Sequence, residues 1–331
     1  MEKRRFGRTG LDVSVLTFGC GAVGGLMTRG LAADQDRAVA WARDNGINHF
    51  DTAPLYGNGA SEENLGRALG KDRKGVIVST KVRFAAEHRG DFGTAIQSSL
   101  ETSLRRLKQD RVDLFQLHNT LGTRSHDNVL SVEEVLDDVV PAFERLQEQG
   151  KVRFLGFTAN GDVDAIHALV KSGRLDGGQF FFNALNPSAG EAIPSRYPGD
   201  DYRQILAVAK EHGVGSIGVR VLAGGALSGS ETRNPLGMPL VDPIGSGRDY
   251  ATDVARSRRF QPLLEAGYVE SLPELAIRFA ISNPDLTTTE IGIASLEEVQ
   301  LATRVVNKGP LPGEAVTQLD RIRREFVGEQ R

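Results

Sequence analysis

Residues 46–66, GINHFDTAPLYGNGASEENLG, change from a strand pattern to a helix pattern within one short segment. The first five residues indicate a short buried strand, and Ser61 followed by two glutamates indicates the start of a helix. Asp51 and Tyr56 lie in the loop between them, which a proline and several glycines shape. The segment therefore predicts one strand–loop–helix unit with two reactive side chains in its loop.

The same alternation continues along the chain on both sides of this unit. A hairpin is predicted over residues 4–15, RRFGRTGLDVSV, and eight short apolar or β-branched runs follow. Each run precedes a segment with helical spacing, clearest over residues 132–146, where seven apolar residues share one face. Ser131, Ser271 and Ser295 each begin an S-x-x-E capping box. The runs are VLTFGCG, INHFDTA, VIVSTKV, DLFQLHN, VRFLGFTA, GQFFFNAL, GSIGVRVLA and TEIGIAS.

Eight strand–helix units determine the expected architecture. Continuous apolar strands favour a parallel sheet buried on both faces, and eight units in 331 residues match a closed (β/α)8 TIM barrel. An open doubly wound sheet is the less favoured alternative. Residues 226–269 predict a long loop after the seventh strand that closes over a ligand. No linker is evident, so we expect a single domain over residues 1–331.

Composition argues against several classes of partner. The net charge is −3 and no dense Lys/Arg block occurs, which argues against nucleic acid or an anionic membrane. Cys20 is the one cysteine, so an intrachain disulfide and a multi-cysteine zinc site are excluded. The charged N-terminus lacks a signal core and no run reaches membrane-spanning length. We expect a cytoplasmic protein; the sequence carries no signal for oligomeric state.

Reactive residues follow three neighbouring strands. Barrel chemistry is built at the C-terminal ends of strands, where Asp51 and Tyr56 follow the second strand, Lys81 ends the third and His118 ends the fourth. Singly, each residue has a structural interpretation: a turn aspartate, a rim tyrosine, a solvated lysine or a loop histidine. Because all four fall on adjacent strand ends, we expect them to converge on one pocket.

This set of side chains suits the reduction of a carbonyl group. The reaction needs a hydride on carbon and a proton on oxygen, and a tyrosine with an ordinary pKa of about 10 is a poor acid at neutral pH. Lys81 would lower that pKa by stabilising the phenolate, and Asp51 would hold Lys81 in place. His118 would donate a hydrogen bond to the substrate oxygen or relay a proton. No metal is required.

Several motifs together resemble the aldo-keto reductase family, in its bacterial branch. They are FGRTGLDVSVLTFGCG, FDTAPLYGNGASEENLGRAL, VIVSTKV, RVDLFQLHN, GKVRFLGFTA and AGGALSG, and they extend over nearly the whole chain. The resemblance implies one (β/α)8 domain that binds a nicotinamide cofactor without a Rossmann fold. It also implies that Tyr56 donates the proton, that Lys81 and Asp51 tune it, and that His118 orients the carbonyl.

The resemblance also implies a set of cofactor contacts, with two departures from the family pattern. Where the family has Ser-Asn after strand five, this chain has Thr158 and Ala159, so either Asn160 takes the amide's role or that contact is lost. Arg220 lies near the position of a nicotinamide-stacking aromatic and would instead reach the pyrophosphate or a substrate anion. The positions implied are Gly21, Thr158, Asn160, Gln179, Arg220, Leu222, Gly224, Ser295 and Glu298.

The choice between NADP and NAD depends on residues 292–305, GIASLEEVQLATRV, which correspond to the family's 2′-phosphate site. A helix N-terminus suits an anion. However, no Lys or Arg occurs from Gly292 to Thr303, and Glu297 and Glu298 occupy the first turn. Family frequency favours NADP and local charge favours NAD; we expect NADP, with NAD as the alternative.

The leading hypothesis is an oxidoreductase that transfers hydride between NAD(P)(H) and an aldehyde, a ketone or a sugar hemiacetal. Two alternatives belong to other classes. One is a non-catalytic, cofactor-sensing barrel resembling potassium-channel β subunits. The other is a Schiff-base aldolase that uses Lys81 as its nucleophile.

Overall fold

Eight parallel strands close into a barrel in the computed structural model, which describes residues 1–243 and 249–330. Each strand overlaps one predicted run, and the ring closes where Thr289 of the last strand pairs with Leu16 of the first. The closed barrel is confirmed and the open sheet is excluded. In chain order the strands are β3 (Leu16–Gly19), β4 (His49–Asp51), β5 (Ile77–Val82), β6 (Val112–Leu117), β9 (Val152–Thr158), β10 (Gly177–Phe181), β11 (Gly215–Val219) and β12 (Thr288–Gly292).

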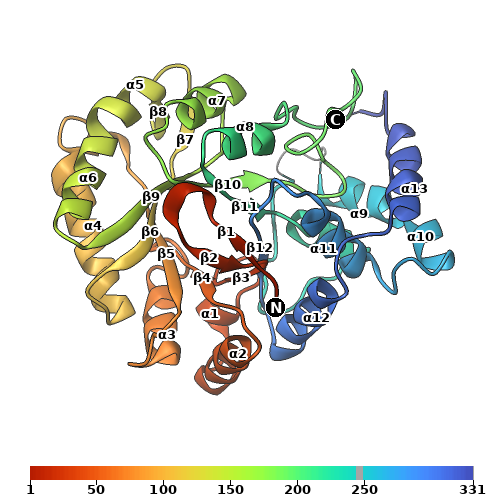
Figure 1. Ribbon diagram of the computed structural model, residues 1–331, viewed down its shortest axis with the longest axis horizontal. Coiled ribbons are helices and arrows are strands. Elements are labelled where there is room, and N and C mark those ends of the chain that lie inside the picture. The colour runs from red at the N-terminus through yellow and green to blue at the C-terminus, as the bar shows by residue number, and fades with distance from the viewer. Residues whose placement is uncertain (244–248, 331) are drawn as a thin grey trace.

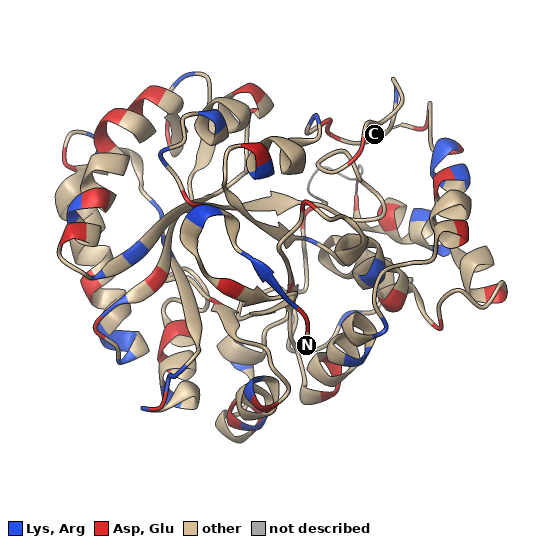
Figure 2. Ribbon diagram, viewed as in Figure 1, with Lys and Arg blue, Asp and Glu red and all other residues tan. Residues whose placement is uncertain are grey.

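Helices surround the barrel and cover the outer face of its strands (Figure 1). Acidic and basic residues are interspersed along these helices in Figure 2, as expected for an outer layer that faces solvent. The main ones are α2 (Ala32–Asp44), α3 (Ala60–Leu69), α4 (Phe92–Leu107), α6 (Val140–Glu148), α7 (Val163–Lys171), α8 (Ile205–Glu211), α11 (Leu272–Ser282), α12 (Leu296–Asn307) and α13 (Gly313–Arg324), with the short α1 (Leu26–Arg29).

The helix predicted over residues 132–146 forms, but with a π turn inside it. Successive segments are α5 (Val132–Glu134), the π-helical η3 (Val135–Val139) and α6. Its apolar face packs into the core as predicted. The predicted N-caps are confirmed, since the hydroxyls of Ser131, Ser271 and Ser295 each accept a hydrogen bond from the backbone three residues on.

The N-terminal hairpin closes the end of the barrel opposite the predicted site. Strands β1 (Lys3–Arg5) and β2 (Asp12–Ser14) pair in antiparallel fashion around the 3₁₀ turn η1 (Gly7–Thr9), and the hairpin lies across the barrel in the centre of Figure 1. Phe6 inserts where two strands carry glycine: a Cβ on Gly177 or Gly215 would lie 2.7 or 2.5 Å from its ring. An apolar floor results, made of Phe6, Val13, Ile77, Leu114 and Ile217.

The segment after β11 is more structured than predicted. It begins with the 3₁₀ turn η4 (Ala223–Ser228) and contains α9 (Tyr250–Arg258) and α10 (Gln261–Glu265), so residues 226–269 are not one long loop. Part of the predicted loop, residues 244–248, lies outside the described residues.

Residues 233–242, here called the bridging segment, connect η4 to the loop after β3. Arg29 of α1 donates from Nε to the carbonyl oxygen of Leu236 at 2.7 Å, and the Met238 amide donates to Val23 at 3.3 Å. Arg233 fixes the other side by donating to the carbonyl oxygens of Met238 and Gly224. Because β12 lies between β11 and β3 in the barrel, this segment passes over the C-terminal end of β12.

Smaller elements surround the same mouth. They are η2 (Ala86–His88), after β5, and a two-stranded sheet of β7 (Thr120–Gly122) and β8 (Val129–Ser131), after β6. No helix within the described residues is long and apolar enough to cross a membrane.

Candidate active site

Three of the four predicted reactive residues are in direct contact at the C-terminal end of the barrel. Lys81, at the end of β5, donates from Nζ to the carboxylate of Asp51, the last residue of β4. The same ammonium donates to the carbonyl oxygen of Thr52 at 2.9 Å and to the Tyr56 hydroxyl at 3.2 Å. Asp51 and Lys81 are completely buried. The short loop after β4 therefore brings the phenol onto a buried ion pair.

The ion pair keeps Lys81 charged. Burial alone would lower the pKa of its ammonium group, but the Asp51 carboxylate, with smaller contributions from Tyr56 and Glu290, raises that pKa above the ordinary value. A buried ammonium group keeps its charge in a protein interior when it is paired with a carboxylate, as Lys81 is with Asp51. A fixed positive charge thus lies beside the Tyr56 oxygen.

The acidity of Tyr56 differs from the sequence-based expectation. Lys81 does lower its pKa, but burial has a larger and opposite effect, and the net result is a pKa raised to about 12. Asp51 and Glu290 add to the increase. Tyr56 is therefore protonated at neutral pH. Lys81 only partly offsets the increase in the pKa of Tyr56 that burial causes.

His118 lies beside the phenol without touching Lys81. Its ring is perpendicular to that of Tyr56, with 6.1 Å between the ring centroids. Burial, then the positive charges of Lys81 and Arg83, lowers the pKa of His118 to about 3. A neutral imidazole carries one N–H, so His118 is able to donate one hydrogen bond at neutral pH but is not a cationic acid.

A ring of polar side chains continues from the ion pair around the inside of the barrel. Gln116 of β6 donates to Asp51 Oδ1 at 2.9 Å, Thr158 of β9 donates to Gln179 at 3.0 Å, and Gln179 of β10 donates to Glu290 of β12 at 2.7 Å. Sequence reasoning missed Gln116 and Glu290. Each lies within a strand run that contains other polar residues, so no signal in the sequence singled it out.

Comparison with known proteins identifies the family. Residues 15–324 match the aldo/keto reductase family. The chain belongs to the aldo/keto reductase family. Members of this family are oxidoreductases that use nicotinamide cofactors, so the prediction of an enzyme of this type is confirmed. Membership of the family specifies neither the substrate nor the choice between NADP and NAD.

Individual relatives of this aldo/keto reductase carry different names. L-galactose dehydrogenase of Arabidopsis thaliana is 28% identical, with 91% of this chain and 86% of the relative covered. A probable voltage-gated potassium channel subunit beta of the same plant is 25% identical, covering 94% and 93%. The solved structure of aldo-keto reductase AKR11C1 from Bacillus halodurans, in its holo form, matches with a TM-score of 0.71 at 25% identity, covering 97% and 96%.

Two positions predicted to contact the cofactor of this aldo/keto reductase adjoin Tyr56. Gly21 follows β3, and a Cβ there would contact the Tyr56 ring at 3.6 Å, so a larger side chain would occupy the space beside the phenol. Arg220 follows β11 in a left-handed conformation and interacts electrostatically with Tyr56. Its Nη1 donates to the carbonyl oxygen of Asp242 at 3.4 Å. A cation therefore stands across the mouth from Lys81.

Three other positions predicted to contact the cofactor form hydrogen bonds with other parts of the protein. The Asn160 amide donates to the Thr120 hydroxyl at 3.3 Å, so it is committed toward β7. The Leu222 carbonyl oxygen accepts hydrogen bonds from two amides of the turn η4. The Gly224 carbonyl oxygen accepts from Arg233, which ties η4 to the bridging segment. Gln179 retains the second N–H of its amide after its bond to Glu290, so it is able to donate one more hydrogen bond.

Two backbone amides at the N-terminus of α12 form hydrogen bonds within this aldo/keto reductase. Ser295 accepts from the Glu298 amide at 3.3 Å, and the Glu298 carboxylate accepts from the Ala294 amide at 2.7 Å. Glu298 also hydrogen-bonds Asn234 of the bridging segment. The capping box thus occupies backbone donors that an anion would otherwise use, and it places a carboxyl group there.

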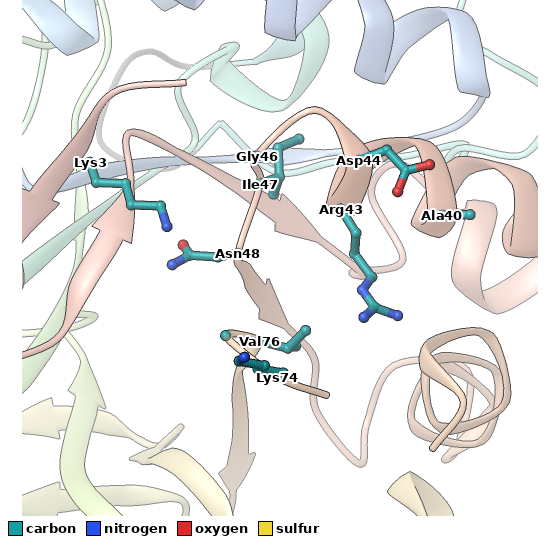
Figure 3. Close-up of a pocket in the computed structure, with 10 residues that line it drawn as sticks. Lys3, Ala40, Arg43, Asp44, Gly46, Ile47, Asn48, Lys74 and Val76 are labelled. Atoms are coloured by element: carbon teal, nitrogen blue, oxygen red, sulfur yellow. The ribbon is translucent and has the colours of Figure 1, made fainter. Parts of the chain in front are cut away.

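A separate surface pocket of about 420 Å³ lies at the opposite end of the barrel (Figure 3). Lys3, Asn48 and Lys74 are among the residues that line it, before the first residues of β4 and β5. None of the four reactive residues lines this pocket, so we assign it no part in the site. Within the described residues no group of three or more His, Cys, Asp or Glu could hold a metal ion.

Proposed function

We propose that this aldo/keto reductase transfers hydride between a nicotinamide cofactor and an aldehyde, a ketone or a sugar hemiacetal, with Tyr56 exchanging the proton. The observation that carries the proposal is the contact of the Tyr56 hydroxyl with an ammonium group that is itself ion-paired to a buried carboxylate. The name of the plant L-galactose dehydrogenase supports the inclusion of sugars.

Each side chain has a distinct task in the proposed reaction. The cofactor, when bound, supplies or accepts the hydride. In reduction Tyr56 gives its proton to the carbonyl oxygen, and the charge of Lys81 stabilises the phenolate that remains. Neutral His118 donates an N–H hydrogen bond to the same oxygen and orients it. In oxidation the phenolate accepts the proton from the alcohol.

We infer that the cofactor is NADH rather than NADPH. The sequence-based expectation was NADP, but the geometry of α12 supports the alternative. Its first turn contains Glu297 and Glu298, its Glu298 amide bonds to Ser295, and the Ala294 amide just before the helix bonds to the Glu298 carboxylate. A 2′-phosphate would meet like charge and displaced donors, whereas a 2′-hydroxyl is able to donate to a carboxylate.

The test combines substitution with cofactor titration. We expect Tyr56→Phe to lower kcat for a panel of aldehydes and sugars by about 100-fold or more, because the proton donor is lost. Fluorescence titration should give nearly the same Kd for NADH in both proteins, and weaker binding of NADPH in both. Near-normal turnover by Tyr56→Phe would remove this residue from the mechanism, and tighter binding of NADPH would overturn the cofactor proposal.

A second candidate function is supported by the potassium channel β subunit among the relatives. A cofactor-sensing barrel would bind NADH without turning it over with any carbonyl of the panel, so the same assay separates the two. The aldolase hypothesis is disfavoured on physical grounds. A Schiff-base lysine needs a neutral amine, and the pairing with Asp51 keeps Lys81 protonated.

A further inference from the structure

Glu290 lies on β12 beside the ion pair that supports Tyr56. Its Oε2 accepts a hydrogen bond from Gln179 at 2.7 Å, and its carboxyl group also hydrogen-bonds Asp51. The neighbouring strand leaves room for it, since a Cβ on Gly19 would lie 3.1 Å from Glu290 Cγ. Glu290 retains some solvent exposure, whereas Asp51 has none. The site thus contains two carboxyl groups in contact.

Two carboxyl groups form a hydrogen bond with each other only if one of them is protonated, because an ionised carboxylate only accepts. Asp51 already accepts from Lys81 at Oδ2 and from Gln116 at Oδ1. Because each Asp51 oxygen already accepts from a donor, the proton shared by the two carboxyl groups is assigned to Glu290. Burial raises the pKa of Glu290 well above its usual range, and the charge of Asp51 raises it further.

We propose that Glu290 carries a proton that it shares with Asp51, and that this neutral acid is a positioning residue for Tyr56 and Gln179. The inference rests on the proposed function, in which those two residues serve the reaction and the cofactor. Oε2 of Glu290 accepts from Gln179, and the carboxyl group donates the shared proton to Asp51. The neutral acid leaves the buried centre with one cation and one anion.

The groups around Glu290 support this charge state. Lys81 of β5 is a cation, but it is paired with Asp51 of β4. Tyr56, after β4, is neutral, and Cys20, after β3, is a neutral thiol because burial raises its pKa well above 9. Ionised Glu290 would add a second negative charge beside one cation, and that charge is one of the causes that raise the pKa of Tyr56. A neutral Glu290 does not destabilise the Tyr56 phenolate in this way.

Glu290→Gln tests the proposal because glutamine has the same shape, donates to Asp51, accepts from Gln179 and cannot ionise. We expect its kcat for alcohol oxidation to stay within about threefold of the wild type from pH 6 to 8. Glu290→Leu removes both hydrogen bonds, so we expect it to weaken NADH binding by about 3- to 10-fold and to lower kcat. A change in kcat of more than about tenfold in Glu290→Gln would contradict a neutral Glu290.

Infrared spectroscopy provides a readout that needs no turnover. The difference spectrum of wild type minus Glu290→Gln at pH 7 should contain the carbonyl stretch of a protonated carboxylic acid. The matched control is Glu62→Gln: Glu62 is completely buried but is held by Thr80 and Arg106 on the outer side of the barrel. This control should retain the Glu290 band. An unchanged band in Glu290→Gln would overturn the proposal, even in a protein without catalytic activity.

Discussion

The reactive side chains of this aldo/keto reductase are arranged by charge as much as by position. Lys81 is the one cation in contact with the Tyr56 hydroxyl among the described residues, and Asp51 balances it. Tyr56 and His118 are both neutral at neutral pH, because burial disfavours the charged form of each. Proton exchange therefore starts from an uncharged donor beside a fixed charge, which suits stabilisation of the phenolate.

The buried histidine His49 predicts a pH dependence of stability. It lies inside the barrel, hydrogen-bonded to Thr17 at 2.8 Å and to Ser79, and burial lowers its pKa to about 4. Between pH 6.5 and 4 the unfolded chain binds a proton that the folded chain does not. The free energy of unfolding should therefore fall as the pH drops through this range, by about 3 kcal/mol for this residue.

Urea denaturation of His49→Gln from pH 7 to 4.5 measures this effect. We expect a shallower loss of stability in the variant than in the wild type, because glutamine keeps a polar side chain but binds no proton. His126→Gln is the control, since His126 is exposed on a loop. Parallel pH profiles for His49→Gln and wild type would show that His49 does not cause the acid sensitivity.

The hairpin β1–β2 predicts a different kind of sensitivity. A Cβ on Gly215 would lie 2.5 Å from the Phe6 ring, so we expect Gly215→Ala to destabilise the protein by about 1–3 kcal/mol. Because Tyr56 is at the other end of the barrel, kcat of the folded protein should stay near the wild-type value. Urea denaturation and turnover, measured on one preparation, check both statements.

The double variant Phe6→Leu with Gly215→Ala separates steric overlap from a general effect of the substitution. A smaller side chain at position 6 gives the added methyl group space, so the two changes should cost less together than the sum of their separate costs. Strict additivity would mean that Gly215 and Phe6 do not conflict.

The secondary structure was largely predictable because local patterns determine it. All eight strands and the three serine N-caps follow from apolar runs and S-x-x-E spacing. The helices α9 and α10 were missed because Gly, Pro and Arg interrupt the apolar spacing of their segment. The π turn η3 was missed because a helical pattern does not report one extra residue in a turn.

The reactive residues were predictable where each follows a strand, since parallel strands bring their C-terminal ends together. Glu290 was not predictable, because a glutamate within a strand run gives no sign of which residue it faces. The raised pKa of Tyr56 was also missed, because the sequence suggests a neighbouring lysine but not that burial outweighs its effect on the phenol.

Considered as one body, the molecule is a barrel with one end sealed and the other crossed by the bridging segment. Arg233 holds that segment through the carbonyl oxygens of Met238 and Gly224, and its guanidinium stacks 5.1 Å from the centroid of the Tyr250 ring. We expect Arg233→Ala to speed NADH dissociation on the order of 10-fold, because the segment would close less firmly over the mouth.

Stopped-flow displacement of bound NADH measures this rate directly. Arg258→Ala is the matched control: Arg258 of α9 donates to Gly229 at 2.9 Å, next to η4 but away from the bridging segment. Equal dissociation rates in the wild type and Arg233→Ala would mean that the segment does not retain the cofactor.

The apolar floor beneath the barrel has a consequence for proton supply. Phe6, Val13 and Ile217 place an apolar layer at that end, and a proton would cross it only at a high cost in free energy. After each reduction a proton would reach the Tyr56 phenolate through the same opening that admits the carbonyl compound. The alcohol product would then leave before Tyr56 is reprotonated, so slow product release would delay both steps.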